Sequence, residues 1–155
     1  MIIKVAKNNI IQHDIISTMN SNIAPPKKAI LKTSLIPNAG RGVFATEFIK
    51  NDEIIENSPI IMLDGEAKHL KDSQLYNYYF VSEDKESVAI ALGFGSLYNH
   101  SYSPNATYIK DFDNQIIIFK AIKDIRPDEE ITVNYNYGNP DDKSTLWTPS
   151  IKPFI

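Results

Sequence analysis

Short apolar runs bounded by Gly, Pro, Asn and Asp follow one another from Ile30 onwards, and this pattern is typical of many short β-strands. The single runs that predict strands are Ile30–Ser34, Val43–Thr46, Glu53–Glu56, Ile60–Leu63, Ser87–Leu92 and Ile131–Tyr135. Two further β-rich runs, Ala106–Phe112 and Gln115–Ile122, flank Asp113-Asn114, which predicts a hairpin with a tight turn.

One segment has helical spacing instead. Lys71–Phe80 offers Asp72 or Ser73 as an N-cap and carries apolar and aromatic residues at helical spacing, so it predicts a short helix whose aromatics face inward. After the run Ser87–Leu92, Gly93-Phe94-Gly95 predicts a loop. The pattern as a whole predicts a mainly β domain with one or two short helices.

Proline-containing stretches divide the chain into three parts. Residues 1–28 are rich in Ile, Asn and Lys and end in two prolines that would break a helix, so we expect an N-terminal arm there. Residues 29–137 form the expected main domain. Residues 138–155 contain three prolines around Trp147, and we expect an irregular segment or a short helix packed by that tryptophan.

The composition fits one compact unit and excludes several site chemistries. The chain has 155 residues, of which 43% are hydrophobic, so a conventional core is available. It has no cysteine, which excludes disulfides, a thiol nucleophile and thiolate zinc sites. His13, His69 and His100 are too far apart in sequence to share a helix face. We therefore expect no metal site, with Asp111 and Asp113 only a weak carboxylate pair.

Charge and hydropathy narrow the partners. With 16 basic and 19 acidic residues the net charge is −3, which argues against a non-specific nucleic-acid binder and is compatible with a basic peptide partner. No window approaches the roughly 18 apolar residues of a membrane span, and residues 1–8 lack the apolar region of a signal peptide. We expect a soluble cytoplasmic or nuclear protein that binds neither nucleic acid nor membrane; nothing in the sequence fixes its oligomeric state.

General catalytic motifs are missing. The chain has no P-loop, no GxSxG elbow and no HExxH. Gly40-Arg41-Gly42 and Gly93-Phe94-Gly95 are GxG pairs, but neither completes a dinucleotide-binding motif between a strand and a helix. In isolation, the first pair is equally well explained by a surface turn before a strand.

Three segments in order carry a specific resemblance. Gly40–Ala45 (GRGVFA), Asn99–Asn105 (NHSYSPN) and Glu129–Tyr135 (EEITVNY) resemble the motifs of SET-domain protein lysine methyltransferases, and Lys50–Glu56 is similar to the flanking family sequence. The resemblance covers roughly Ile30–Tyr137. It implies a β-clip-like assembly of small curved sheets with a C-terminal pseudoknot that brings the second and third segments together.

The resemblance also implies S-adenosylmethionine as cofactor. Arg41, Gly42 and Val43 match a segment whose backbone lies against that cofactor, and Asn99 with His100 matches the pair that holds it. Glycine suits close backbone approach because a side chain would block it. An isolated histidine would more readily be a satisfied core residue, but within NHSxxPN the cofactor role is favoured.

Aromatic residues supply the implied catalytic parts. Tyr135 matches the tyrosine implied to be catalytic and to touch the cofactor, although a strand tyrosine can also simply fill a core. Tyr108 and Tyr137 match the channel for the substrate lysine, where Tyr108 favours addition of a single methyl group; otherwise both are ordinary sheet aromatics. Trp147 is implied to pack over the cofactor and the channel, and anchoring the tail is its alternative.

Two residues depart from the family pattern. Tyr102 stands where many members have cysteine, and Asn134 stands where most have aspartate. The absence of cysteine also excludes the zinc-bound modules that flank many SET domains, so the tail must complete the site without metal. The loss of a carboxylate at Asn134 puts the local electrostatics in doubt.

These observations predict an enzyme, a protein-lysine N-methyltransferase acting on a histone or another protein. The alternatives are a non-catalytic SET-fold adaptor or cofactor-binding interaction module, and an unrelated β-sheet interaction domain. Asp111, Asp113 and the run Asp128-Glu129-Glu130 would present an acidic surface that steers a basic peptide, or else form solvated turns.

Overall fold

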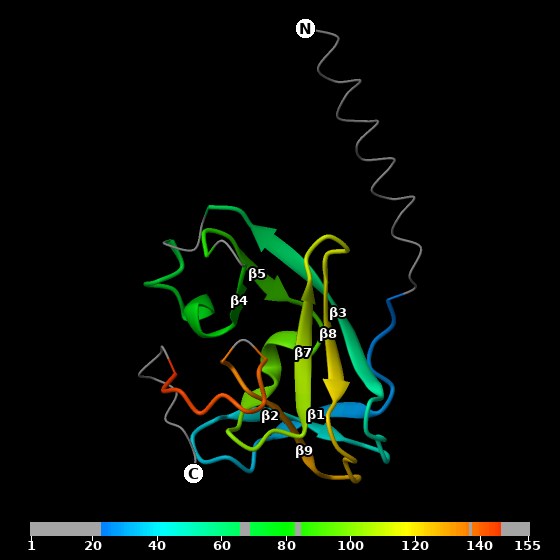
Figure 1. The fold of residues 1–155 in the computed structure, drawn as a ribbon. Coiled ribbons are helices and arrows are strands. Elements are labelled where there is room, and N and C mark those ends of the chain that lie inside the picture. Colours follow the sequence, from blue (N-terminus) through cyan, green and yellow to red (C-terminus); the bar gives the residue numbers. More distant parts are fainter. Residues whose placement is uncertain (1–22, 66–68, 83–84, 137, 147–155) are drawn as a thin grey trace, which may run out of the picture.

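The computed structural model describes residues 23–65, 69–82, 85–136 and 138–146 (Figure 1). Its strands are β1 (Ala29–Thr33), β2 (Arg41–Ala45), β3 (Ile54–Leu63), β4 (Tyr79–Val81), β5 (Val88–Ala91), β6 (Asn99–His100), β7 (Ala106–Asp111), β8 (Ile116–Ala121) and β9 (Glu130–Val133). Two short 3-10 helices, η2 (Gln74–Asn77) and η3 (Gly95–Leu97), lie between them. The expected mainly β fold is confirmed.

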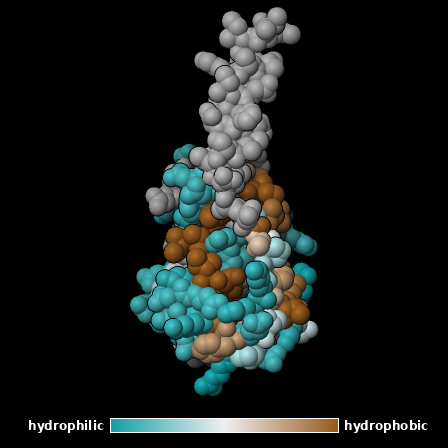
Figure 2. Space-filling view, turned by 90° about the vertical axis from the view of Figure 1, so that its right-hand side faces the viewer, coloured by the Kyte–Doolittle hydropathy of each residue, from teal (hydrophilic) through white to brown (hydrophobic). Residues whose placement is uncertain are grey.

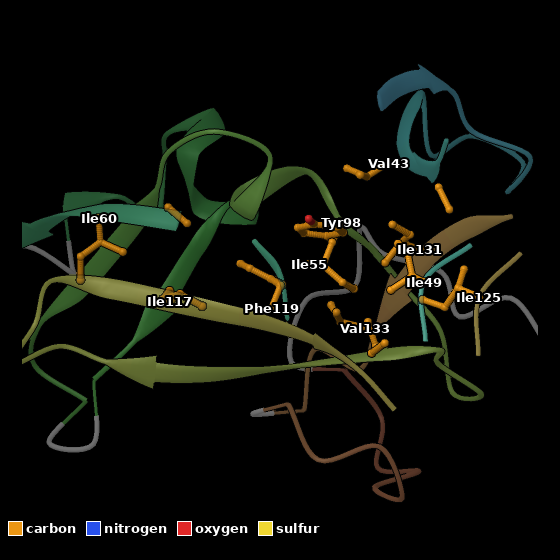
Figure 3. Close-up of a cluster of buried hydrophobic side chains, with 14 of the residues drawn as sticks. Val43, Ile49, Ile55, Ile60, Tyr98, Ile117, Phe119, Ile125, Ile131 and Val133 are labelled. Atoms are coloured by element: carbon orange, nitrogen blue, oxygen red, sulfur yellow. The ribbon is translucent and has the colours of Figure 1, made fainter. Parts of the chain in front are cut away.

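The strands form two sheets that pack around a shared core. One has four strands in the order β1-β2-β9-β6, and the other has five in the order β4-β5-β3-β8-β7. In Figure 1 the long strands β3, β8 and β7 stand side by side above β1, β2 and β9. Figure 3 shows the core between them, to which the smaller sheet contributes Val43, Ile131 and Val133 and the larger one contributes Phe119.

Alternation along β8 explains how the larger sheet packs. Ile117, Phe119 and Ala121 are fully buried, and the β-branched residues of this strand favour extended backbone. The ring of Tyr98 stacks on Phe119 with 4.4 Å between centroids, at the centre of the cluster drawn in Figure 3. Tyr98 thereby anchors the chain just before β6 in the core.

The smaller sheet joins distant parts of the chain. Strand β9 lies between β2 and β6, and it pairs in parallel with β6 through Asn99 opposite Thr132 and His100 opposite Val133. Asn105 reinforces this junction, because its Oδ1 accepts from the Thr132 N–H at 2.8 Å and its Nδ2 donates to the Glu130 carbonyl at 2.9 Å. The second and third sequence segments therefore meet, as the pseudoknot requires.

Strand β3 is longer than the sequence predicts. Glu53–Glu56 and Ile60–Leu63 were expected as separate strands, yet one strand runs through Pro59. It pairs with β8 up to Pro59 and with β5 from Ile60 onwards. The proline lies where the pairing partner changes, so its missing N–H removes little from the ladder.

The predicted helix Lys71–Phe80 is mostly wrong. Only η2 forms, with the Ser73 hydroxyl capping it by accepting from the Leu75 N–H at 3.1 Å. Tyr79 and Phe80 instead belong to β4, which pairs with β5, so tertiary pairing overrides the local spacing. Phe80 does face the core, but Tyr78 is 42% exposed, contrary to the expected inward face.

The predicted hairpin is present, with a wider turn than Asp113-Asn114 alone. Residues 112–115 form the connection between β7 and β8, and Gln115 takes a positive φ of 55°. On the described part of the chain no helix is long and apolar enough to cross a membrane. Within the same residues, no three acidic or histidine side chains are grouped to hold a metal ion.

The larger sheet also has apolar side chains on its outer surface. Ile54 and Ile61 of β3 and Ile109 of β7 are about half exposed. Figure 2, which views the molecule from the right-hand side of Figure 1, shows apolar patches separated by hydrophilic areas. The residues expected to carry chemistry lie elsewhere, around β6 and β9.

Candidate active site

A pocket of about 140 Å³ opens between β4, η3, β7 and β9. It contains both Tyr108 and Tyr135, which the sequence assigned to lysine binding and catalysis. The full lining is Asn77, Tyr78, Tyr79, Phe80, Val81, Gly95, Ser96, Tyr98, Tyr108, Lys110, Val133 and Tyr135. A narrow, largely aromatic pocket of this kind suits an unbranched alkyl chain that ends in one polar group.

Tyr135 is fixed from both ends in this pocket. Its hydroxyl donates to the Tyr98 carbonyl oxygen at 2.8 Å, and its backbone N–H donates to His100 Nδ1 at 3.1 Å. Burial, followed by the charges of Tyr78 and Glu130, raises the pKa of the Tyr135 phenol. The hydroxyl therefore stays protonated and serves as a positioned hydrogen-bond donor.

A buried acid supports Tyr98 from behind. Glu56 is 4% exposed, and its Oε2 accepts from the Tyr98 hydroxyl at 2.9 Å while its Oε1 accepts from the Phe94 N–H at 2.9 Å. Desolvation is the main cause that raises the pKa of this carboxyl. Glu56 and Tyr98 were not singled out from sequence, because they lie 42 positions apart and no local pattern joins them.

Tyr108 forms the pocket wall opposite β4. Its ring meets Phe80 edge to face at 5.0 Å between centroids, and its hydroxyl lies 3.5 Å from the Tyr135 carbonyl oxygen. Gly138 lies directly over Tyr108, because a Cβ there would come within 2.7 Å of the Tyr108 carbonyl oxygen. The chain after β9 thus packs against Tyr108, one of the residues that line the pocket.

Asn99, which lies on β6 beside β9, is held by a polar network. Its Nδ2 donates to the Arg41 carbonyl oxygen at 2.9 Å and to Glu130 Oε1 at 2.7 Å. The Glu130 carboxylate also accepts from the Ser34 hydroxyl and the Leu35 N–H. With both Nδ2 hydrogens used, Asn99 Oδ1 is the atom left to bind a ligand, since none of the described residues donates to it.

Gly42 provides the space for this network. A Cβ at this position would lie 2.1 Å from Glu130 Oε1 and 3.0 Å from Asn99 Nδ2. The sequence offered close approach to a cofactor as the reason for this glycine, whereas the structure shows a close approach to Glu130. Glu130 had been grouped with an acidic turn, so its inward position was missed.

His100 is a buried, neutral histidine. Burial, and secondarily the nearby Lys143 ammonium, lowers its pKa from 6.5 to about 4. Because Nδ1 accepts from the Tyr135 N–H, the neutral ring carries its proton on Nε2. That buried Nε2 has no partner among the residues that the structure describes. A polar atom of this kind is a natural contact for a bound ligand.

The other predicted site residues fall into three groups. Arg41 begins β2 with an exposed side chain. Val43 is fully buried, and its backbone pairs with Leu31 and Ile131, so its side chain belongs to the core. Tyr137 and Trp147 lie outside the described residues, and their assigned roles stay predictions.

The acidic run does not form one surface. Asp128 is exposed and pairs with Lys32 at 2.6 Å, and Glu129 Oε2 accepts from the Arg126 N–H at 2.7 Å, as in a solvated turn. Glu130 instead points toward Asn99. Asp128 and Glu129 therefore stay at the surface, and Glu130 adds nothing to an acidic patch there.

Comparisons with known proteins agree with this architecture. A family model, described as the SET domain, matches residues 40–136. A curated histone-lysine N-methyltransferase of Schizosaccharomyces pombe, H3 lysine-37 specific, is 38% identical over 99 residues, which are 62% of this chain. The chain spans 66% of that relative's length.

Solved structures give the same answer. A Plasmodium falciparum protein described as a histone methyltransferase is 33% identical with a TM-score of 0.57, covering 72% of this chain and 95% of its own. A Chaetomium thermophilum polycomb repressive complex 2 bound to S-adenosylmethionine has a TM-score of 0.58 at 22% identity, over 74% of this chain and 16% of its own, and shows the fold alone. The chain belongs to the SET-domain family, as the three sequence segments predicted.

Proposed function

We propose that this protein is a protein-lysine N-methyltransferase that uses S-adenosylmethionine. The observation that carries the proposal is the convergence of Tyr108 and Tyr135 in one aromatic pocket, with Asn99 and His100 next to it on β6. The family and the named activity of the Schizosaccharomyces pombe relative support the same reaction.

The pocket suits a lysine side chain in its neutral form. A lysine amine has a reference pKa of about 10.4, and only its neutral form has the lone pair that attacks a methyl group. Aromatic walls from Phe80, Tyr98 and Tyr108 disfavour the ammonium by desolvation. Tyr135, whose hydroxyl is protonated and held by the Tyr98 carbonyl, would orient the amine rather than remove its proton.

The residues at Asn99 fit the proposed cofactor. When bound, S-adenosylmethionine supplies an electrophilic methyl group on a sulfonium. Asn99 Oδ1 and the carbonyl of Arg41 are acceptors that match its amino group, and Glu130 adds a negative charge that takes no part in the ion pairs of the described residues. The buried Nε2–H of His100 offers a donor.

The substrate class follows from the relatives. One relative is named for lysine 37 of histone H3, and another is described as a histone methyltransferase, so we propose a lysine in a basic protein segment, with histone H3 as the first substrate to test. The Tyr108 hydroxyl in a pocket of about 140 Å³ favours a monomethylated product.

Two measurements test this function. Titration calorimetry should detect S-adenosylmethionine binding that Asn99→Ala abolishes and that the exposed control Asn38→Ala retains. Labelled-methyl transfer to histone H3 should then fall at least a hundredfold in Tyr135→Phe while cofactor binding persists, and mass spectrometry should find one added methyl group. Binding without transfer to any histone or lysate protein would instead favour the adaptor, and a folded protein that binds no cofactor would contradict both.

A further inference from the structure

After β9 the chain turns at Gly138 and continues as an irregular segment, residues 138–146, drawn in orange and red in Figure 1. The segment starts beside β7, where the Thr107 hydroxyl donates to the Gly138 carbonyl oxygen. It ends at Leu146, which is 6% exposed and therefore anchored in the domain. We call residues 138–146 the tail segment.

Side chains of the domain hold the backbone of the tail segment. Asn134 Nδ2 donates to the Asp142 carbonyl oxygen at 2.6 Å, and Asn136 Nδ2 donates to the Ser144 carbonyl oxygen at 2.8 Å. The Tyr102 hydroxyl donates to the same Ser144 oxygen at 3.0 Å. These three donors bind two carbonyl oxygens of the tail, those of Asp142 and Ser144, and restrict its motion.

The two asparagines are buried and coupled. Asn134 is fully buried and Asn136 nearly so, and Asn134 Oδ1 accepts from the Asn136 N–H at 3.0 Å. Buried amides are costly to leave unpaired, so both side chains depend on the tail carbonyls. The tail also donates to the domain, because Lys143 Nζ donates to the Tyr102 carbonyl oxygen.

Both departures from the family pattern belong to this arrangement. An aspartate at position 134 would have no N–H for the Asp142 carbonyl, and its charge would face that oxygen. A cysteine at position 102 could not reach Ser144 as the phenol does. Tyr102 and Asn134, two departures from the family pattern that looked unrelated in the sequence, thus both contact the tail segment.

The tail segment contacts two parts of the site, the Tyr108 wall of the pocket and the surroundings of His100. Gly138 covers Tyr108 in the pocket, and Tyr102 meets the His100 ring edge to face at 4.5 Å between centroids. The Lys143 ammonium is close enough to help lower the pKa of His100. A shift of the tail would therefore disturb the surroundings of His100 and the pocket wall together.

We propose that Tyr102, Asn134 and Asn136 form a metal-free clamp that fixes the tail segment over the site and on which S-adenosylmethionine affinity depends. The ligand in this proposal rests on the proposed function. The clamp does by hydrogen bonds what a cysteine-free chain cannot do with bound zinc. All three are positioning residues, since they act through the tail.

The test compares Tyr102→Phe and Asn134→Asp with two matched controls. Tyr76→Phe makes the same phenol-to-phenyl change in η2, at a residue outside the clamp and the tail segment, and Asn38→Asp makes the same amide-to-acid change at an exposed turn. Amide hydrogen exchange followed by mass spectrometry should accelerate in residues 138–146 of both clamp variants and stay unchanged in the controls. S-adenosylmethionine should bind roughly three- to tenfold more weakly to Tyr102→Phe, as expected for one lost hydrogen bond, and at least tenfold more weakly to Asn134→Asp.

The outcomes separate the clamp from the proposed function. Tyr102→Phe keeps the ring at a partly exposed position, so this variant should fold. Its exchange rates and its affinity therefore test the clamp even if Asn134→Asp does not fold. Wild-type exchange in both variants overturns the clamp, and faster exchange with unchanged affinity overturns its role in cofactor binding. A wild-type protein that binds no S-adenosylmethionine contradicts the proposed function and the affinity claim, while the exchange data still decide whether the clamp exists.

Discussion

The two halves of the site are each built around a carboxylate and a glycine. In the half that contains the aromatic pocket, which we call the pocket half, a Cβ on Gly93 would lie 2.3 Å from Glu56 Oε1. In the half around Asn99 that we propose to bind the cofactor, which we call the cofactor half, a Cβ on Gly42 would lie 2.1 Å from Glu130 Oε1. Both glycines come from the GxG pairs that failed to complete a nucleotide-binding motif. In both places the missing side chain makes room for an acid.

The surroundings of the two acids differ. Glu56 is desolvated in the core and holds the Tyr98 hydroxyl and the Phe94 N–H. Glu130 is partly exposed and holds Asn99 together with neighbouring polar groups. A disturbance of the pocket half should therefore appear mainly as lost stability, and one of the cofactor half mainly as lost ligand affinity.

Gly93→Ala should have the largest effect. Gly93 has a φ of +65°, so alanine adds backbone strain of roughly 1 kcal/mol to the clash with Glu56, and we expect a total loss of about 4 kcal/mol. Gly65→Ala is the matched control, because Gly65 has a φ of +67° with open space around it and should lose only about 1 kcal/mol. Urea unfolding measures both, and equal losses would show that Glu56 moves aside freely.

His100, which joins the two halves, should make stability depend on pH. Its ring has a pKa of 6.5 when unfolded and about 4 when folded, so above pH 6.5 both states are neutral and it has no effect. As the pH is lowered from 6.5 to 4, only the unfolded state gains a proton. The free energy of unfolding therefore decreases, by about 3 kcal/mol at pH 4.

Two experiments check the His100 prediction. The NMR signal of the His100 ring should titrate near pH 4. The free energy of unfolding of His100→Asn should fall less than that of the wild type over the same range. A His100 signal that titrates near pH 6.5 would mean that the ring is solvated.

Gly42→Ala should show most clearly that the cofactor half affects ligand affinity more than stability. Gly42 lies within β2, so alanine costs through its contact with Glu130 and Asn99, and we expect about 2 kcal/mol of stability and more than tenfold of S-adenosylmethionine affinity to be lost. Gly40→Ala adds a Cβ that meets nothing within 4 Å, so it should lose only about 1 kcal/mol of stability to the strain of a φ of +74° and should bind S-adenosylmethionine within threefold of wild type. Urea unfolding measures the loss of stability, and calorimetric titration measures the loss of affinity. Wild-type affinity in Gly42→Ala would show that the network of Asn99 and Glu130 takes no part in ligand binding.

The ordered motifs predicted the family because the residues of each motif are local in sequence, and the resemblance to that family then implied the meeting of β6 with β9. Strand periodicity found most of the strands for the same reason. It failed at Lys71–Phe80, where pairing of β4 with β5 overrides a helical spacing, and at Pro59, where a change of partner tolerates a proline.

The supporting residues were harder to predict. Glu56 and Tyr98 are 42 positions apart, and Asn99 and Glu130 are 31 apart, so no local pattern links them. Two clamp residues were noticed only as departures, Tyr102 and Asn134, because their partners are backbone carbonyls that any sequence offers. Side chains that recognise backbone leave no pairwise signal.

The smallest expected effect distinguishes two acids of one sequence run. Glu130→Gln keeps one oxygen but loses the charge that Ser34, Leu35 and Asn99 share, so we expect about 1 kcal/mol of stability and roughly fivefold of cofactor affinity to be lost. Asp128→Asn is the control, since it breaks only an exposed ion pair with Lys32 and should change stability by less than about 0.5 kcal/mol and leave affinity unchanged. Urea unfolding and calorimetry measure both variants side by side. Equal results would mean that Glu130 is as solvated as Asp128, and the cofactor half would then have no carboxylate holding Asn99 in place.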